Sequence, residues 1–194
     1  MLITIISSVL LSLWPPQGYS EILDEAIYNC PNANPNDIDL DLVHDLSEIE
    51  REYFEKFDIP EDLKGMLLAV ACSESGYNSR AIGQKGKAKG VMQLQFWWEK
   101  KYKIKRANHK EAAKAWMAHL TKLKTKNDKR GLCSKKVIPL KRWLAAWTAV
   151  ERAASKSNCY GTPKHYKLLQ RWRRSIKVRR VESVPYDYPY PDGC

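Results

Sequence analysis

The chain has 194 residues and a formal net charge of +11 at pH 7. That length is enough for one domain that buries a core, with extensions at its ends. The five cysteines show no Cys-x-x-Cys spacing and the four histidines show no ligand spacing, so neither a metal ion nor another cofactor is expected and each histidine is predicted to be a surface or helix-face residue.

The chain begins with an apolar run from Leu2 to Leu13, followed by the small residues Gly18 and Ser20. This run is too short to span a bilayer, which takes roughly 20 residues. Small residues after a short apolar run are typical of a secretory signal, so residues 1–20 are predicted to be a signal peptide and the protein to be exported, either periplasmic or secreted. An uncleaved anchor or a buried N-terminal helix is the alternative.

Charge is divided between two parts of the chain. Residues 21–62 hold 14 acidic and two basic residues, whereas residues 63–194 hold eight acidic and 31 basic ones. This division predicts an acidic N-terminal segment and a long basic surface with an anionic partner, which could be nucleic acid, an anionic cell-wall polymer or the acidic segment itself. The alternative is an ordinary solvated surface rich in lysine.

Apolar residues at spacings of three and four predict five helices and no convincing pair of strands. In chain order they cover residues 41–57, 63–76, 110–124, 140–154 and 163–176. The fold class predicted from this pattern is all-α, with an irregular loop at residues 83–89. The predicted domain boundaries are 1–20 for the signal peptide, 21–62 for the acidic helical segment, 63–178 for a compact domain, and 179–194 for a tail rich in Tyr and Pro.

Capping residues mark several helix ends. Asp58 is predicted to cap the second helix, with Pro60 in its first turn, and Asn108 to cap the third. Pro139 and Pro163 are predicted to open the last two helices. Gly76 is a natural terminator for the second helix.

The five cysteines allow at most two internal disulfides and leave one thiol over. Cys133 and Cys159 flank one predicted helix and form the first expected pair. Cys72 lies on the apolar face of the second helix and is expected to be an ordinary core residue. The remaining connectivity stays open.

Glu74 is the residue whose setting says most about chemistry. It stands in the last turn of an apolar helix, where the helix dipole disfavours a carboxylate. Apolar neighbours, expected to be Val70, Met92, Trp97 and Trp98, should raise its pKa further through desolvation. A carboxyl with a raised pKa could serve as a general acid, although most glutamates at helix ends are simply exposed and solvated.

The sequence around Glu74 resembles the catalytic signature of the soluble lytic transglycosylases. Residues 74–78 read Glu-Ser-Gly-Tyr-Asn and residues 90–93 read Gly-Val-Met-Gln, with Ala81, Gly86 and Ala88 between them. This family shares the goose-type lysozyme fold, so the resemblance, which covers roughly residues 63–174, implies a lysozyme-like helical domain with the irregular glycine-rich loop beside an active-site groove.

The resemblance also implies roles for individual residues. Glu74 would be the general acid and then the base, Gln93 an amide that contacts the glycan, and Met92 a lid packed on the acid. Ser75 and Tyr77 belong to the same motif and are further substrate-binding candidates.

Two later motifs match less completely. The family's Ala-Tyr-Asn-Ala-Gly corresponds to Ala-Trp-Thr-Ala-Val at residues 146–150, which makes Trp147 the first choice for stacking on a sugar ring. Tyr166 is the nearest counterpart of a family tyrosine that faces the acid. Gly83 stands where the family usually has serine, and the loop before Gly90 is one residue longer, which points to an altered substrate preference.

The reaction that the resemblance implies uses a single acid. Glu74 would cut the β-1,4 bond between N-acetylmuramic acid and N-acetylglucosamine in peptidoglycan and leave a 1,6-anhydro sugar, with no cofactor. The expected partners are peptidoglycan glycan strands and other anionic wall polymers, and the protein is expected to be a monomer. Hydrolysis with Glu99 or Glu151 as a second carboxylate is an alternative.

Two alternatives from other classes stay open. The chain could be a cell-wall-binding protein that keeps the fold without the reaction. It could also bind nucleic acid, because residues 100–106 and 165–180 combine basic and aromatic side chains, a pattern that such proteins share.

Overall fold

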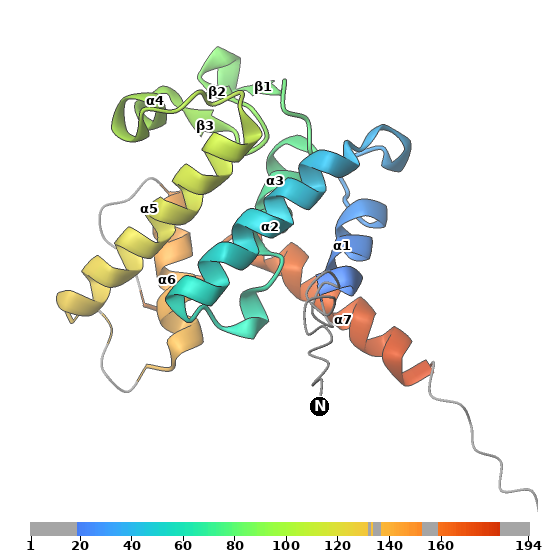
Figure 1. Cartoon of the computed structure of the whole chain (residues 1–194). Coiled ribbons are helices and arrows are strands. Elements are labelled where there is room, and N and C mark those ends of the chain that lie inside the picture. Colours follow the sequence, from blue (N-terminus) through green and yellow to red (C-terminus); the bar gives the residue numbers. More distant parts are fainter. Residues whose placement is uncertain (1–18, 132, 134–136, 153–158, 183–194) are drawn as a thin grey trace, which may run out of the picture.

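The computed structural model describes residues 19–131, 133, 137–152 and 159–182. Most of the predicted signal peptide and most of the predicted 179–194 tail therefore lie outside the described residues, and residues 179–182 belong to the last helix. The described part is mostly helical, as predicted (Figure 1). Its α-helices are α1 (Tyr19–Tyr28), α2 (Leu40–Phe57), α3 (Met66–Ser75), α4 (Phe96–Tyr102), α5 (His109–Lys129), α6 (Pro139–Glu151) and α7 (Tyr166–Glu182).

The central helix of the fold is α3. Every residue from Met66 to Cys72 is buried, as expected for a helix that is apolar on all sides. It packs against α1, α2 and α7, while α5 lies between α2 and α6 (Figure 1). Ile22 of α1 and Leu46 of α2 are buried in the same core, so the acidic stretch and the helices that follow it share one hydrophobic centre.

The start of α3 is held by a buried carboxylate from α2. Glu50 is fully buried and accepts hydrogen bonds from the backbone N–H groups of Gly65 at 2.8 Å and Leu67 at 2.9 Å. These N–H groups would otherwise have no partner at a helix N-terminus, where the dipole also favours a negative charge. The opening of the central helix therefore depends on a residue 15 positions earlier in the chain.

Several predicted helix ends are found where expected, but the prediction for Pro163 was wrong, because the last helix begins at Tyr166. Asn108 caps α5 by accepting the N–H of Glu111, and Pro139 opens α6. The prediction for Asp58 was wrong, because Asp58 ends α2 in a left-handed conformation with φ of 47°. Aspartate tolerates this conformation better than most residues, so the same residue type suits either side of a helix boundary.

Two disulfides cross-link the described residues. The predicted bridge between Cys133 and Cys159 is present. The second bridge joins Cys30 to Cys72, so the prediction of Cys72 as an ordinary core residue was wrong. Its partner lies just beyond α1, a helix not predicted from the sequence, and a buried half-cystine has the same apolar setting as a buried free cysteine.

A small antiparallel sheet was also not predicted. Its strands, β1 (Ile82–Gly83), β2 (Ala88–Lys89) and β3 (Leu94–Gln95), pair in the order β1-β2-β3. Strands of two residues are too short for a period-two pattern to identify them. The sheet and α4 lie together at one end of the molecule (Figure 1).

The side chain of Arg106 binds the backbone of the loop that carries this sheet. This buried side chain donates from Nη1 to the carbonyls of Lys87 at 2.8 Å and Leu94 at 2.9 Å. Gly90 has φ of 77°, and a Cβ there would lie 2.0 Å from the carbonyl oxygen of Arg106, so glycine is needed at this approach. None of the helices in the described residues is both long and apolar enough to cross a membrane.

Candidate active site

Glu74 lies in the last turn of α3. The helix ends because Gly76 adopts a left-handed conformation and donates its N–H to the carbonyl of Cys72 at 2.9 Å. A Cβ at position 76 would lie 2.1 Å from the carbonyl oxygen of Asn32, so a side chain does not fit there. The chain turns away at this point and leaves the Glu74 side chain 25% exposed.

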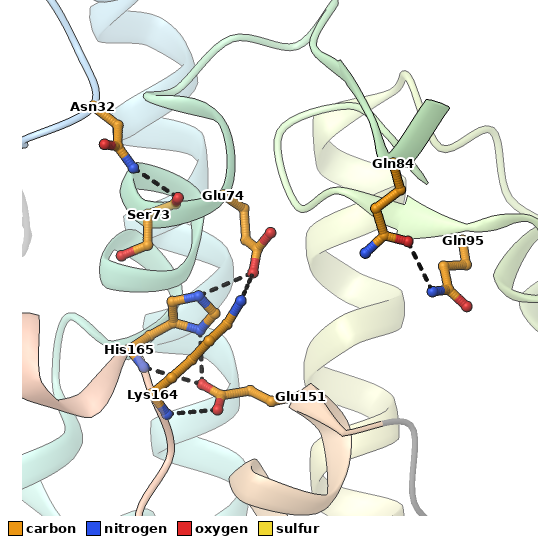
Figure 2. A network of polar contacts seen from close by, with 8 residues as sticks. All are labelled: Asn32, Ser73, Glu74, Gln84, Gln95, Glu151, Lys164 and His165. Atoms are coloured by element: carbon orange, nitrogen blue, oxygen red, sulfur yellow. Dashed lines mark hydrogen bonds and ion pairs between the residues drawn. The ribbon is translucent and has the colours of Figure 1, made fainter. Parts of the chain in front are cut away.

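Two cationic side chains meet the Glu74 carboxylate (Figure 2). Lys164 donates from Nζ to Oε1 of Glu74 at 2.7 Å, and Nε2 of His165 lies 2.9 Å from the same oxygen. On the other side of the ring, Nδ1 of His165 lies 2.7 Å from Oε1 of Glu151. The imidazole therefore lies between two carboxylates, and only 6% of its side chain is exposed.

Glu151, the last residue of α6, fixes the segment that carries both cations. Its carboxylate accepts the backbone N–H of Lys164 at 2.6 Å and that of His165 at 3.2 Å. Its side chain is 8% exposed. Because backbone as well as side-chain atoms are bound, the positions of Lys164 and His165 are set before α7 begins.

These contacts shift the pKa of Glu74 in the direction opposite to the expected one. Burial raises the pKa of its carboxyl, but contacts with His165 and Lys164 outweigh burial and lower the pKa below its usual value of 4.5. Burial lowers the pKa of His165, but contacts with Glu151 and Glu74 raise it above its usual 6.5. The prediction of a raised Glu74 pKa was wrong, because it considered the apolar neighbours and not the cations. Glu74 is ionised at neutral pH in the free protein.

A cavity of about 120 Å³ opens beside Glu74. The apolar residues predicted to surround the acid all line it, namely Val70, Met92, Trp97 and Trp98. Trp97 and Trp98 stack with ring centroids 4.5 Å apart, and Trp98 is almost completely buried. A stacked pair of aromatic rings is therefore part of the cavity lining.

Polar side chains also line the cavity. Gln84 and Gln95 extend from the hairpin, and their side-chain amides hydrogen-bond to one another at 3.1 Å. Figure 2 shows this pair across the view from Glu74. Amide groups both donate and accept hydrogen bonds, so these side chains suit a ligand rich in hydroxyl and amide groups.

Gln93 also lines the cavity, but its amide nitrogen is occupied. It donates to the carbonyls of Ala81 at 3.0 Å and Gly90 at 2.8 Å. A Cβ at Gly83 would lie 2.3 Å from Oε1 of Gln93. The glycine that departs from the family pattern thus provides the space in which this amide lies, and only the remaining part of the amide can face a ligand.

Trp147 does not line the cavity. It is fully buried and packs edge-on against Trp116 at 6.2 Å and Tyr166 at 6.1 Å between ring centroids. The prediction that Trp147 stacks on a sugar ring was therefore wrong. A helical face made of alanine and tryptophan suits close packing against α5 as well as it suits a binding groove, so its position could not be decided from the sequence.

The other predicted site residues have structural contacts. Tyr166 lines a separate groove with Gln170 and Arg173, and the residue that reaches Glu74 is its neighbour His165. Tyr77 is buried and donates its hydroxyl to the carbonyl of Leu68 at 3.3 Å. The hydroxyl of Ser75 donates back along α3, to a carbonyl one turn earlier.

The residues missed by sequence reasoning come from the far end of the chain. His165, predicted to be a surface or helix-face residue, is buried at the site, and Lys164 was not singled out at all. Both lie about 90 positions from Glu74, and no short-range spacing links them to it. Glu151 had been considered only as a second carboxylate. The one available signal was a Lys-His pair directly before a predicted helix.

The described residues hold no group of three or more His, Cys, Asp or Glu side chains able to bind a metal ion. The candidate site consists of a partly exposed carboxylate, two cationic side chains that bind it, and a small cavity lined by aromatic rings and side-chain amides.

Comparison with protein-family models, with curated proteins and with solved structures finds no match to this chain.

Proposed function

We propose that the protein is a peptidoglycan lytic transglycosylase with a goose-type lysozyme-like fold, and that Glu74 is its catalytic acid. The observation that carries this proposal is the place of Glu74, at the end of the central helix and beside a cavity walled by aromatic rings and side-chain amides. Aromatic faces and amides are the groups that suit sugar rings and their N-acetyl substituents. The resemblance of residues 74–93 to the family signature supports the same conclusion.

In this reaction Glu74 donates its proton to the oxygen of the glycosidic bond between N-acetylmuramic acid and N-acetylglucosamine. The C1–O bond breaks, the electron pair stays with the leaving oxygen, and positive charge develops at C1. The substrate's own 6-hydroxyl oxygen then attacks C1, and Glu74 takes the hydroxyl proton. The products are a 1,6-anhydro-muramic end and a free sugar end, with no water consumed.

Glu74 must gain a proton before it can act. Protonating a carboxyl with the usual pKa of 4.5 costs about 3.4 kcal/mol at pH 7, and the lowered pKa of Glu74 adds to this cost. A glycan that enters the cavity and separates Lys164 from Glu74 would reduce the cost, because it removes one of the cations that stabilise the carboxylate. Binding and protonation are therefore coupled in the proposed mechanism.

The surroundings of the other acids favour the single-acid reaction over hydrolysis with two carboxylates. Glu151 is almost completely buried, and its oxygens already accept two backbone N–H groups and face His165. Glu99 pairs with Arg106 at 3.0 Å. Glu151 is therefore not free to activate a water molecule or attack a sugar carbon, and Glu99 does not line the cavity beside Glu74.

The test is incubation of the purified protein with peptidoglycan, followed by mass spectrometry of the released fragments. Wild-type protein should release anhydro-muropeptides, and Glu74→Gln should release none. Glu55→Gln, at an exposed acid on α2, is the matched control and should retain wild-type activity. Equal release by wild type and Glu74→Gln would contradict the role of Glu74.

A second candidate is a wall-binding protein without catalytic activity. The observation in its favour is the ion pairing of Glu74 with two cations, which keeps the carboxylate ionised at neutral pH. Tight binding to purified peptidoglycan without release of any fragment would support it over the enzyme.

Export is part of the proposal. Two disulfides among the described residues are typical of proteins in oxidising compartments such as the periplasm or the exterior of the cell. Peptidoglycan lies in such a compartment. We propose that the glycan strands are the main partner and that the basic surface adds affinity for anionic wall polymers.

A further inference from the structure

Glu74 is held by two cations that differ in their access to a ligand. The His165 side chain is 6% exposed, whereas the Lys164 side chain is 65% exposed. Both residues line the cavity, and Figure 2 shows the long side chain of Lys164 extending past His165 to the Glu74 carboxylate. A ligand that enters the cavity therefore meets the ammonium group of Lys164 and leaves the imidazole in place.

Lys164 can move without disturbing the rest of the site. Its backbone N–H is bound to Glu151 at 2.6 Å, so the peptide stays fixed while the four-carbon side chain rotates. Among the described residues the only ion-pair partner of its ammonium group is Glu74. If the ammonium group leaves, Glu74 keeps His165 as its remaining cationic partner, and the carboxylate stays aligned.

The chemistry of the ligand decides whether this movement is favourable. A neutral glycan would have to break the Lys164–Glu74 pair and offer only hydroxyl or amide oxygens in return. A glycan with a carboxylate beside the scissile bond would give Lys164 a new partner of the same charge, so one ion pair replaces another. The site is also set in the basic part of the chain, which attracts anions before they bind.

Building on the function proposed above, we propose that Lys164 is a specificity-determining residue that selects glycans with free carboxylates, such as strands whose muramic acid lactyl groups carry no peptide. In the free protein the lysine pairs with Glu74; in the complex it pairs with the glycan carboxylate. Glu74 is then released from one of its two cations at the moment when the scissile bond lies beside it. Neutral glycans are poor substrates because they leave this pair intact.

The experiment compares two forms of one glycan. Peptidoglycan strands stripped of their peptides carry free lactyl carboxylates, and a second sample has these carboxylates converted to primary amides. Cleavage of each is measured as kcat/KM for wild type, Lys164→Met and the control Lys167→Met, which changes an exposed lysine on α7. Circular dichroism and thermal denaturation establish that each variant is folded.

Wild type and Lys167→Met should prefer the carboxylate form by about two- to fivefold, the size expected of one ion pair exposed to solvent. Lys164→Met should cleave both forms at similar rates, mainly because cleavage of the amidated form increases. Retention of the preference in Lys164→Met, or no preference in wild type, would overturn the inference and leave the proposed function standing. If neither stripped form is cleaved while wild type still releases anhydro-muropeptides from intact peptidoglycan, this inference is overturned and the proposed function stands. If intact peptidoglycan is not cleaved either, the proposed function fails.

Discussion

The bridge between Cys30 and Cys72 should contribute more to stability than any other single contact near the site. It closes a loop between residues 42 positions apart, and the chain-entropy relation gives about 4 kcal/mol for a loop of that length. Both cysteines are buried, so the double variant Cys30→Ala, Cys72→Ala also loses some packing. We expect a decrease of about 4 kcal/mol in the free energy of unfolding, measured by urea denaturation.

Two controls separate the loop effect from other causes. The experiment uses a Cys194→Ser background, so that the fifth cysteine cannot exchange with either bridge. The bridge between Cys133 and Cys159 spans 26 positions, and its removal should cost about 3.5 kcal/mol by the same relation. A loss below about 1 kcal/mol for Cys30 and Cys72 would refute the reasoning that loop closure sets the stability of this half of the molecule.

Three other predictions concern stability. Glu50→Ala should lower the free energy of unfolding by about 3 kcal/mol, because two backbone N–H groups at the start of α3 lose their buried partner; unchanged urea denaturation would contradict this. Gly90→Ala should lower the melting temperature more than Gly86→Ala, since a Cβ at 90 meets the backbone of Arg106 and one at 86 meets nothing; equal shifts would exclude the clash as the cause. The raised pKa of His165 means that its protonation stabilises the folded state fully below pH 6.5 and that this contribution is lost as the pH rises through the folded pKa. The stability difference between wild type and His165→Gln should therefore be larger at pH 5.5 than at pH 9, and a constant difference would count against the ionic contacts.

The helical framework could be predicted because its signals are local. Asn108 and Pro139 mark helix starts through their own backbone preferences, and the apolar spacing of α2 and α5 is regular over several turns. Val70 and Met92 were found for the same reason, since Val70 lies one turn before Glu74 and Met92 lies in the same motif, and Trp97 and Trp98 follow that motif closely. Short elements such as β1 or α4 carry too few residues for periodicity to identify them.

The polar half of the site could not be predicted, because it depends on tertiary contacts. Lys164 and His165 reach Glu74 only because Glu151 binds their backbone at the end of α6. Nothing in the local sequence fixes that contact. The prediction for Trp147 was wrong for a related reason, since the packing of α6 against α5 decides whether this side chain lies in the core or in a groove.

The contact between Gly83 and Gln93 makes these two positions a coupled pair. A Gly83→Ser change, which would restore the residue usual in the family that the chain resembles, places a Cβ 2.3 Å from Oε1 of Gln93. The Gln93 amide would have to move away and lose its hydrogen bonds to the carbonyls of Ala81 and Gly90. Gly83→Ser and a substitution of Gln93 should therefore have non-additive effects on stability in a double-mutant cycle. In this chain a serine at 83 therefore requires a different position for the Gln93 side chain, so the loop conformation and this one residue change together.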